Sequence, residues 1–170
     1  TPAVTAQSNW QLLNDLAVMA INNKEYGKAR KLLESATILK QDAAINNNLG
    51  IVHAQMGHKQ EASQYFDKAK LRKEARYNLG LILMQNGEYA KAIPFLKNHP
   101  NINLAYAQLM NNDNRAALDT FHKIKMNNAM DYYLMAVAAA RTKDTKEMAL
   151  SLTKAIQMQP NLKNWAATDI

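Results

Sequence analysis

The sequence predicts an all-α fold built from stacked antiparallel helix pairs. Apolar residues recur at intervals of three and four positions, which is the spacing of one face of an α-helix. Alanine, leucine, methionine, lysine and glutamine, all strong helix formers, dominate the periodic stretches. The same arrangement returns along most of the 170 residues, and regular recurrence of this kind indicates a repeat architecture.

Five copies of one pattern carry this prediction. In each copy a Leu or Met is followed by a small residue, which we call the small marker. A second recurring residue, the second marker, stands 12 positions after it. The marker pairs are Ala17 and Ala29, Gly50 and Ala62, Gly80 and Ala92, Ala105 and Ala117, and Ala136 and Met148. Small side chains at such positions let two helices approach to about 8–10 Å. A single pair cannot bury both of its apolar faces, so neighbouring pairs must stack.

A short polar segment divides each copy into two halves, as residues 85–88 do in the third copy. Such a segment has room only for a tight turn between antiparallel helices. The spacing between successive copies is irregular and is shortest around residues 97–103, where Pro100 prevents a continuous helix. Pro94 also falls inside a predicted helix, and we expect it near that helix's start.

Over roughly residues 10–160 the chain resembles a tetratricopeptide repeat protein. The resemblance rests on Leu49-Gly50, Leu79-Gly80, Ala62 with Phe66, Ala117 with Phe121, and Pro160. It implies a right-handed α-solenoid of about five irregular repeats, over roughly residues 10–42, 43–72, 73–97, 98–128 and 129–162. We expect one domain over residues 1–170. Because the chain begins with Thr and not Met, we also expect it to be a fragment of a longer protein.

Composition and motifs argue against catalysis. The chain has no Cys, and neither a nucleophile elbow nor a glycine-rich phosphate loop occurs. The four histidines, His53, His58, His99 and His122, lack a dense metal-ligand spacing. We therefore predict a protein that is not an enzyme and has no metal, cofactor or small-molecule substrate. His53 falls where its helix faces a partner helix, so we expect a hydrogen-bonded core imidazole there.

The longest apolar run, residues 132–140, predicts a buried helix and is too short to cross a membrane. The net charge is +7, and residues 68–76 gather five basic side chains. This segment could meet phosphate or an acidic partner. It could equally be a solvated outer face, because Asp67 and Glu74 interrupt it and no aromatic residues are interleaved. Binding of nucleic acid is accordingly the least favoured function.

The family resemblance implies that the first helix of each pair lines a concave groove that contacts a protein or peptide. The positions that would touch the partner are Asn14, Val18, Asn48, Ile51, Tyr77, Asn78, Leu81, Asn103, Tyr106, Tyr133, Val137 and Arg141. The asparagines at 48, 78 and 103 share one phase. They could hydrogen-bond a peptide backbone or bond within the scaffold. The apolar members could be covered by a partner, by the superhelix itself or by an extension of the chain.

Two functions follow from this reading. The first is a non-catalytic scaffold that holds a peptide or protein segment in the concave groove. The alternative is a structural spacer or assembly module in a larger multidomain cell-envelope protein. Many Asn and Lys with no Cys suit a bacterial protein, and we lean to the envelope or periplasm over the cytoplasm.

Overall fold

The computed structural model describes residues 7–98 and 100–169, and over these residues it contains eleven α-helices and no strand. The all-α prediction is confirmed. The chain divides into two compact units, one up to Leu83 and one from Met84. No helix in the described ranges is both long and apolar enough to span a bilayer.

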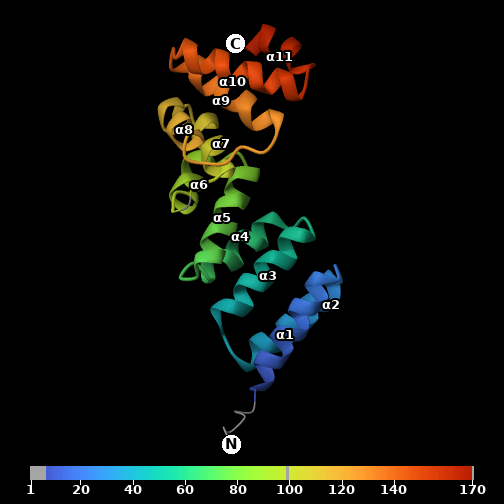
Figure 1. Cartoon of the computed structure of the whole chain (residues 1–170). Helices are drawn as coiled ribbons and strands as arrows, with labels where there is room; N and C mark the ends of the chain where they lie inside the picture. The colour runs from blue at the N-terminus through green and yellow to red at the C-terminus, as the bar shows by residue number, and fades with distance from the viewer. Residues whose placement is uncertain (1–6, 99, 170) are drawn as a thin grey trace, which may run out of the picture. The chain divides into compact units, whose positions relative to one another are not determined.

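Unit 1 contains two complete helix pairs and most of a fifth helix. Its helices are α1 (Asn9–Asn22), α2 (Tyr26–Leu39), α3 (Ala43–Gln55), α4 (Lys59–Lys68) and α5 (Lys73–Gln85), the last extending past the end of the unit. α1 packs on α2, α3 on α4, and α2 on α3 (Figure 1). The core between them is made of small and branched side chains: Ala17, Ala20, Ala29, Leu33, Ala36, Ile45, Leu49 and Val52.

Unit 2 contains α6 (Tyr89–Leu96), α7 (Ile102–Met110), α8 (Asn114–Phe121), α9 (Ala129–Arg141), α10 (Thr145–Met158) and α11 (Leu162–Asp169). α7 packs on α8, α9 on α10, and α8 on α9. The predicted buried helix is α9, whose residues Met135, Ala136, Ala138 and Ala139 are almost completely buried. Side chains at three helix starts accept a hydrogen bond from the first turn, those of Asn101, Asn128 and Asp144.

The turn within each pair follows one backbone rule. The residue seven positions after the small marker has positive φ in all five copies, at Lys24, Gly57, Gly87, Asn112 and Lys143. Glycine takes this left-handed conformation at no steric cost, and asparagine tolerates it. A lysine there crowds its Cβ against the following carbonyl, so two of the five turns are locally strained.

Replacing Lys143 with glycine is therefore expected to stabilise unit 2 by up to about 1 kcal/mol, because the strained side chain is removed from a left-handed position. Thermal and urea unfolding of the two proteins would measure this. Lys146→Gly is the matched control, since it puts glycine inside α10 and should destabilise by roughly 1 kcal/mol. A loss of stability at both positions would contradict the account of the turn.

A small residue is indispensable where α3 crosses α4. A Cβ placed on Gly50 would lie 2.5 Å from two ring carbons of Phe66, closer than carbon atoms can approach. The Phe66 ring is itself buried, so it has little room to move away. The expectation that the small marker sets the approach of paired helices is met at this position.

Pro94 lies deeper in its helix than expected. It is the sixth of the eight residues of α6, and the helix ends two residues later at Leu96. Because proline has no N–H, the carbonyl of Ala90 loses its usual helical donor. Only the last turn of α6 is affected, which agrees with the shortness of this helix and with the break before α7 begins at Ile102.

Candidate functional site

The first helices of unit 1 are tied together by pairs of asparagine side chains. Asn48 Nδ2 on α3 donates to Asn14 Oδ1 on α1 at 2.9 Å, and Asn78 Nδ2 on α5 donates to Asn47 Oδ1 on α3 at 3.3 Å. Both bonds join equivalent repeat positions, since each donor lies two residues before its small marker and each acceptor three residues before. Asn48 and Asn78 thus form hydrogen bonds within the scaffold, which is one of the two alternatives that the sequence left open.

Predicted contact residues surround these amide pairs. We call the following set the first-helix surface of unit 1: Asn14, Val18, Asn48, Ile51, Tyr77, Asn78 and Leu81. Val18 is exposed, and the other six are partly buried. The set has no charged side chain, so it presents amides, one phenol and branched apolar groups. Asn47, which is buried and accepts the bond from Asn78, was not among the predicted contact residues.

In unit 2, two of the predicted contact residues are buried and not accessible. Tyr133 and Val137 on α9 are buried. Over Tyr133 lies α11, from which the Trp165 ring meets the phenol ring edge to face at a centroid distance of 6.1 Å. The Tyr133 hydroxyl donates to Asp169 Oδ2 at 2.7 Å. A partner could contact Tyr133 only if α11 moved. Tyr133 is therefore not the accessible contact residue that the sequence predicted.

Burial raises the pKa of Tyr133 to about 12, and the hydrogen bond and negative charge of Asp169 add to the rise. The folded pKa lies above the ordinary value of 10.0, so the neutral phenol stabilises the fold fully below pH 10. This contribution is lost as the pH rises through 10 towards 12.

We therefore expect Tyr133 to ionise late in an absorbance titration of the folded protein, with a pKa raised from 10.0 to about 12. Tyr133→Phe should remove that late step. It should also loosen α11 by about 1–3 kcal/mol, because a hydrogen bond to a carboxylate is lost. Hydrogen exchange over residues 162–169 would report the loosening. Unchanged exchange there would show that the hydroxyl contributes nothing to holding α11.

The remaining predicted contact residues of unit 2 differ in burial and in the groups they contact. Asn103 and Tyr106 on α7 are partly buried, and Arg141 at the end of α9 is exposed. The Tyr106 ring meets Tyr89 of α6 edge to face at 6.1 Å, and burial raises the pKa of Tyr106. Arg141 Nη1 donates to the Leu109 carbonyl at 3.4 Å. Unlike Asn48 with Asn14 and Asn78 with Asn47 in unit 1, these three side chains are not joined to one another by any hydrogen bond described above.

The histidines show no sign of a metal centre. Within residues 7–98 and 100–169, no three His, Cys, Asp or Glu side chains are grouped as metal ligands would be. His99 lies outside the described residues. His53 stacks on Tyr65 of α4 at 5.1 Å, and its Nδ1 is buried with no hydrogen-bond partner in the described part of the chain. The expectation of a hydrogen-bonded imidazole is therefore wrong at Nδ1.

Protonation of His53 is opposed by its surroundings. Burial lowers its pKa below 6.5, and the neighbouring His58 and the charge of Arg30 lower it further, whereas Glu61 and Glu34 act in the opposite direction. The unfolded chain therefore takes up this proton more readily than the folded chain. The stability of unit 1 should fall as the pH drops below about 6.5.

The variant His53→Phe should show a shallower loss of stability than the native protein between pH 7 and pH 5, because the unfolded chain no longer gains that proton. Urea unfolding at several pH values, followed by circular dichroism, measures this. His122→Phe is the control, since His122 lies on the surface of unit 2 near Glu147. Equal pH profiles for native protein and His53→Phe would contradict the assignment.

The basic segment is partly neutralised by its own acids. Lys70 Nζ lies 3.2 Å from Asp67 Oδ1, and Arg72 Nε lies 3.8 Å from Glu74 Oε2. Lys68 Nζ stands 5.1 Å from the centre of the Tyr65 ring. These are exposed contacts that contribute little to stability. Lys68, Lys70 and Arg72 are exposed, whereas Arg76 is partly buried, so the segment does not form one uniformly exposed basic patch.

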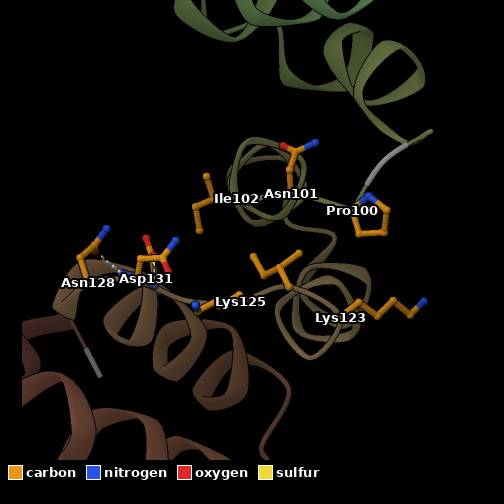
Figure 2. A pocket seen from close by; sticks show the side chains of 9 residues that line it. Pro100, Asn101, Ile102, Lys123, Lys125, Asn128 and Asp131 are labelled. Carbon is orange, nitrogen blue, oxygen red and sulfur yellow. Dashed lines mark hydrogen bonds between the residues drawn. The ribbon is translucent and has the colours of Figure 1, made fainter.

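A hollow of about 470 Å³ lies in unit 2 where α7 and α9 begin. Figure 2 shows Asn101 and Asn128 at its edges, with the Lys123 side chain extending away from Asn128 and Asp131. The Asn101 and Asn128 amide oxygens already accept backbone N–H groups at 3.1 and 3.0 Å, and Asp131 accepts from the Asn127 N–H. The Asn101, Asn128 and Asp131 side chains are thus engaged with backbone N–H groups, and we assign the hollow no ligand.

Comparison with known proteins accords with the repeats. Residues 43–75 and 73–98 match two family profiles, both described as tetratricopeptide repeat. No curated protein sequence matches the chain.

Several solved structures share the fold. YrrB, described as a tetratricopeptide repeat protein with an unusual peptide-binding site, superimposes with a TM-score of 0.78 at 21% identity, over 87% of this chain and 85% of YrrB. MamA from Desulfovibrio magneticus RS-1 gives 0.76 at 19% identity, over 91% and 97%. MamA from AMB-1 gives 0.77 at 18% identity, over 89% and 99%. The matched profiles show tetratricopeptide repeats over residues 43–98, and the chain shares the fold of these solved structures.

Proposed function

We propose that the chain is a non-catalytic interaction scaffold that binds a peptide or a segment of a partner protein on the first-helix surface of unit 1. The observation that carries the proposal is the pair of asparagine bonds, Asn48 to Asn14 and Asn78 to Asn47. They hold α1, α3 and α5 in register, so the apolar side chains one turn further along these helices are presented in a fixed arrangement. A pre-organised surface loses less conformational entropy when it binds.

The amides retain hydrogen-bonding capacity for a ligand. A primary amide has two N–H donors and an oxygen with two lone pairs, and each interhelical bond uses one donor of Asn48 or Asn78. The remaining positions can pair with the backbone of an extended peptide. Val18, Ile51 and Leu81 lie one helical turn after the asparagines at 14, 48 and 78, and they can receive apolar side chains of the same peptide.

The absence of charge from this surface narrows the partner's chemistry. A clamp for a terminal carboxylate needs Lys or Arg side chains among the asparagines, and the seven residues of the surface include neither. A neutral or apolar segment suits it better than an acidic tail. YrrB, which has the same fold, supports the idea that this fold can carry a peptide-binding site.

Selection from a library of displayed peptides against the purified chain tests the proposal. Selected peptides should bind Ile51→Glu at least about tenfold more weakly, because a buried unpaired carboxylate costs more than 1.4 kcal/mol. Leu150→Glu is the matched control, since Leu150 is an exposed leucine on α10. Equal affinity for native protein and Ile51→Glu would exclude this surface. A failure to select any peptide would favour the spacer function.

A further inference from the structure

A second apolar surface lies on another face of α1. Leu12, Leu16 and Met19 are 49%, 41% and 61% exposed, and together we call them the α1 outer stripe. They are spaced four and three residues apart, so they lie in one row along the helix. At about 100° per residue, Asn14 and Val18 point roughly to the opposite side. The α1 outer stripe is therefore separate from the first-helix surface of unit 1.

The repeat supplies an internal control for this exposure. Counted from the small marker, the three stripe positions are five residues before, one before and two after. In α3 the same positions are Ile45, Leu49 and Val52, which are 1%, 1% and 0% exposed. The corresponding residues of α5, Ala75, Leu79 and Ile82, are also buried. The stripe has the same chemistry as its counterparts, but it is uncovered.

The element that covers the α3 positions shows what kind of surface they accept. α2 packs against α3, and its buried residues Ala29, Leu33 and Ala36 join Ile45, Leu49 and Val52 in one core. These α2 residues are again spaced four and three apart. The large side chains of α3 therefore pack against a row on α2 in which one leucine lies between two alanines.

We propose that the α1 outer stripe docks a helix of a separate protein, one that presents alanine, leucine and alanine at this spacing beside basic residues. The docked helix would continue the contact seen between α2 and α3. The preference for basic residues follows from charge. Asp15 is the only charged residue of α1, and it is exposed on the edge of the stripe. α2 itself has three basic residues and one acidic residue.

A second copy of the chain fits this surface less well. Its α2 row is already buried in its own core, so a second copy cannot present that row, and the symmetric alternative is contact between the two α1 outer stripes. Two such stripes would oppose large side chains to large side chains. They would also bring two Asp15 carboxylates close together with no basic residue on either α1 to offset them, and like charges repel.

The test uses a synthetic peptide of residues 25–41, held helical by a hydrocarbon staple between positions 34 and 38, which are exposed in α2. The full chain is titrated with this peptide, and the methyl signals of Leu12, Leu16 and Met19 are followed by NMR. We expect saturable shifts of these signals. Leu16→Glu in the protein, or Leu33→Glu in the peptide, should weaken binding at least about tenfold.

Three controls make the result decisive. Leu150→Glu should leave the peptide's affinity unchanged, and so should Ile51→Glu, which separates this inference from the proposed function. Asp15→Lys should weaken binding, with a smaller dependence on salt. Unshifted methyl signals at saturating peptide, or equal weakening by Leu16→Glu and Leu150→Glu, would overturn the proposal. A dimer detected by sedimentation and abolished by Leu16→Glu would also overturn it, since a second copy would then occupy the stripe.

Discussion

Gly50→Leu is expected to lower the free energy of unfolding of unit 1 by about 3 kcal/mol, the upper end of the usual cost of overpacking. The first atom of any side chain at this position lies 2.5 Å from the Phe66 ring. The ring is buried against α3 and cannot rotate into solvent without opening the core. The better helix propensity of leucine returns roughly 1 kcal/mol at most, so the steric term decides the sign. Urea unfolding followed by circular dichroism would measure the change.

Gly27→Leu is the matched control. A Cβ at Gly27 would meet nothing within 4 Å, so leucine there should be neutral or slightly stabilising. Adding Phe66→Ala to Gly50→Leu should recover part of the loss, because the added side chain then has space. A double-mutant cycle would give the coupling energy between the two positions. If Gly50→Leu and Gly27→Leu had the same effect, close approach of α3 and α4 would not explain the glycine.

Phe121→Ala is expected to destabilise unit 2 by about 3–5 kcal/mol, the range found when a buried aromatic ring is replaced by a methyl group. Phe121 at the end of α8 is completely buried in the core formed with α9. Its removal leaves a cavity that the surrounding helices can fill only in part. Hydrogen exchange of the α9 amides would report the loss within unit 2.

The exposed leucine of α10 provides the comparison. Leu150→Ala removes a side chain that is mostly in solvent, and such changes usually fall within about 0.5 kcal/mol. A Phe121→Ala protein as stable as Leu150→Ala would show that α8 is not anchored through this ring.

Much of the fold could be predicted because its strongest signal is periodic. The chain is helical as the periodicity predicts, and Gly50 opposes Phe66 as the small marker requires. Stacking makes each pair depend chiefly on its neighbours, so a short stretch of sequence contains most of the relevant information. The turns were harder to predict. Lys24 and Lys143 adopt positive φ, which their residue type disfavours and only their place in the repeat reveals.

The candidate site was less predictable, because burial depends on residues distant in sequence. Tyr133 has the phase of a groove residue, yet it is covered by α11, where its partner Asp169 is 36 positions away. Nothing in the sequence around Tyr133 indicates that contact. The asparagine phase indicated a common face, but the phase alone could not say that Asn48 bonds to Asn14 or Asn78 to Asn47. The exposed α1 outer stripe could be recognised only by comparing its burial with that of α3.

The most direct test of the central claim is an NMR map of the chain bound to a peptide selected on it. Binding on the first-helix surface of unit 1 predicts shifts concentrated at the methyl groups of Val18, Ile51 and Leu81 and at the side-chain amides of Asn48 and Asn78. Shifts at outer positions such as Leu150, with those five side chains unchanged, would contradict the claim.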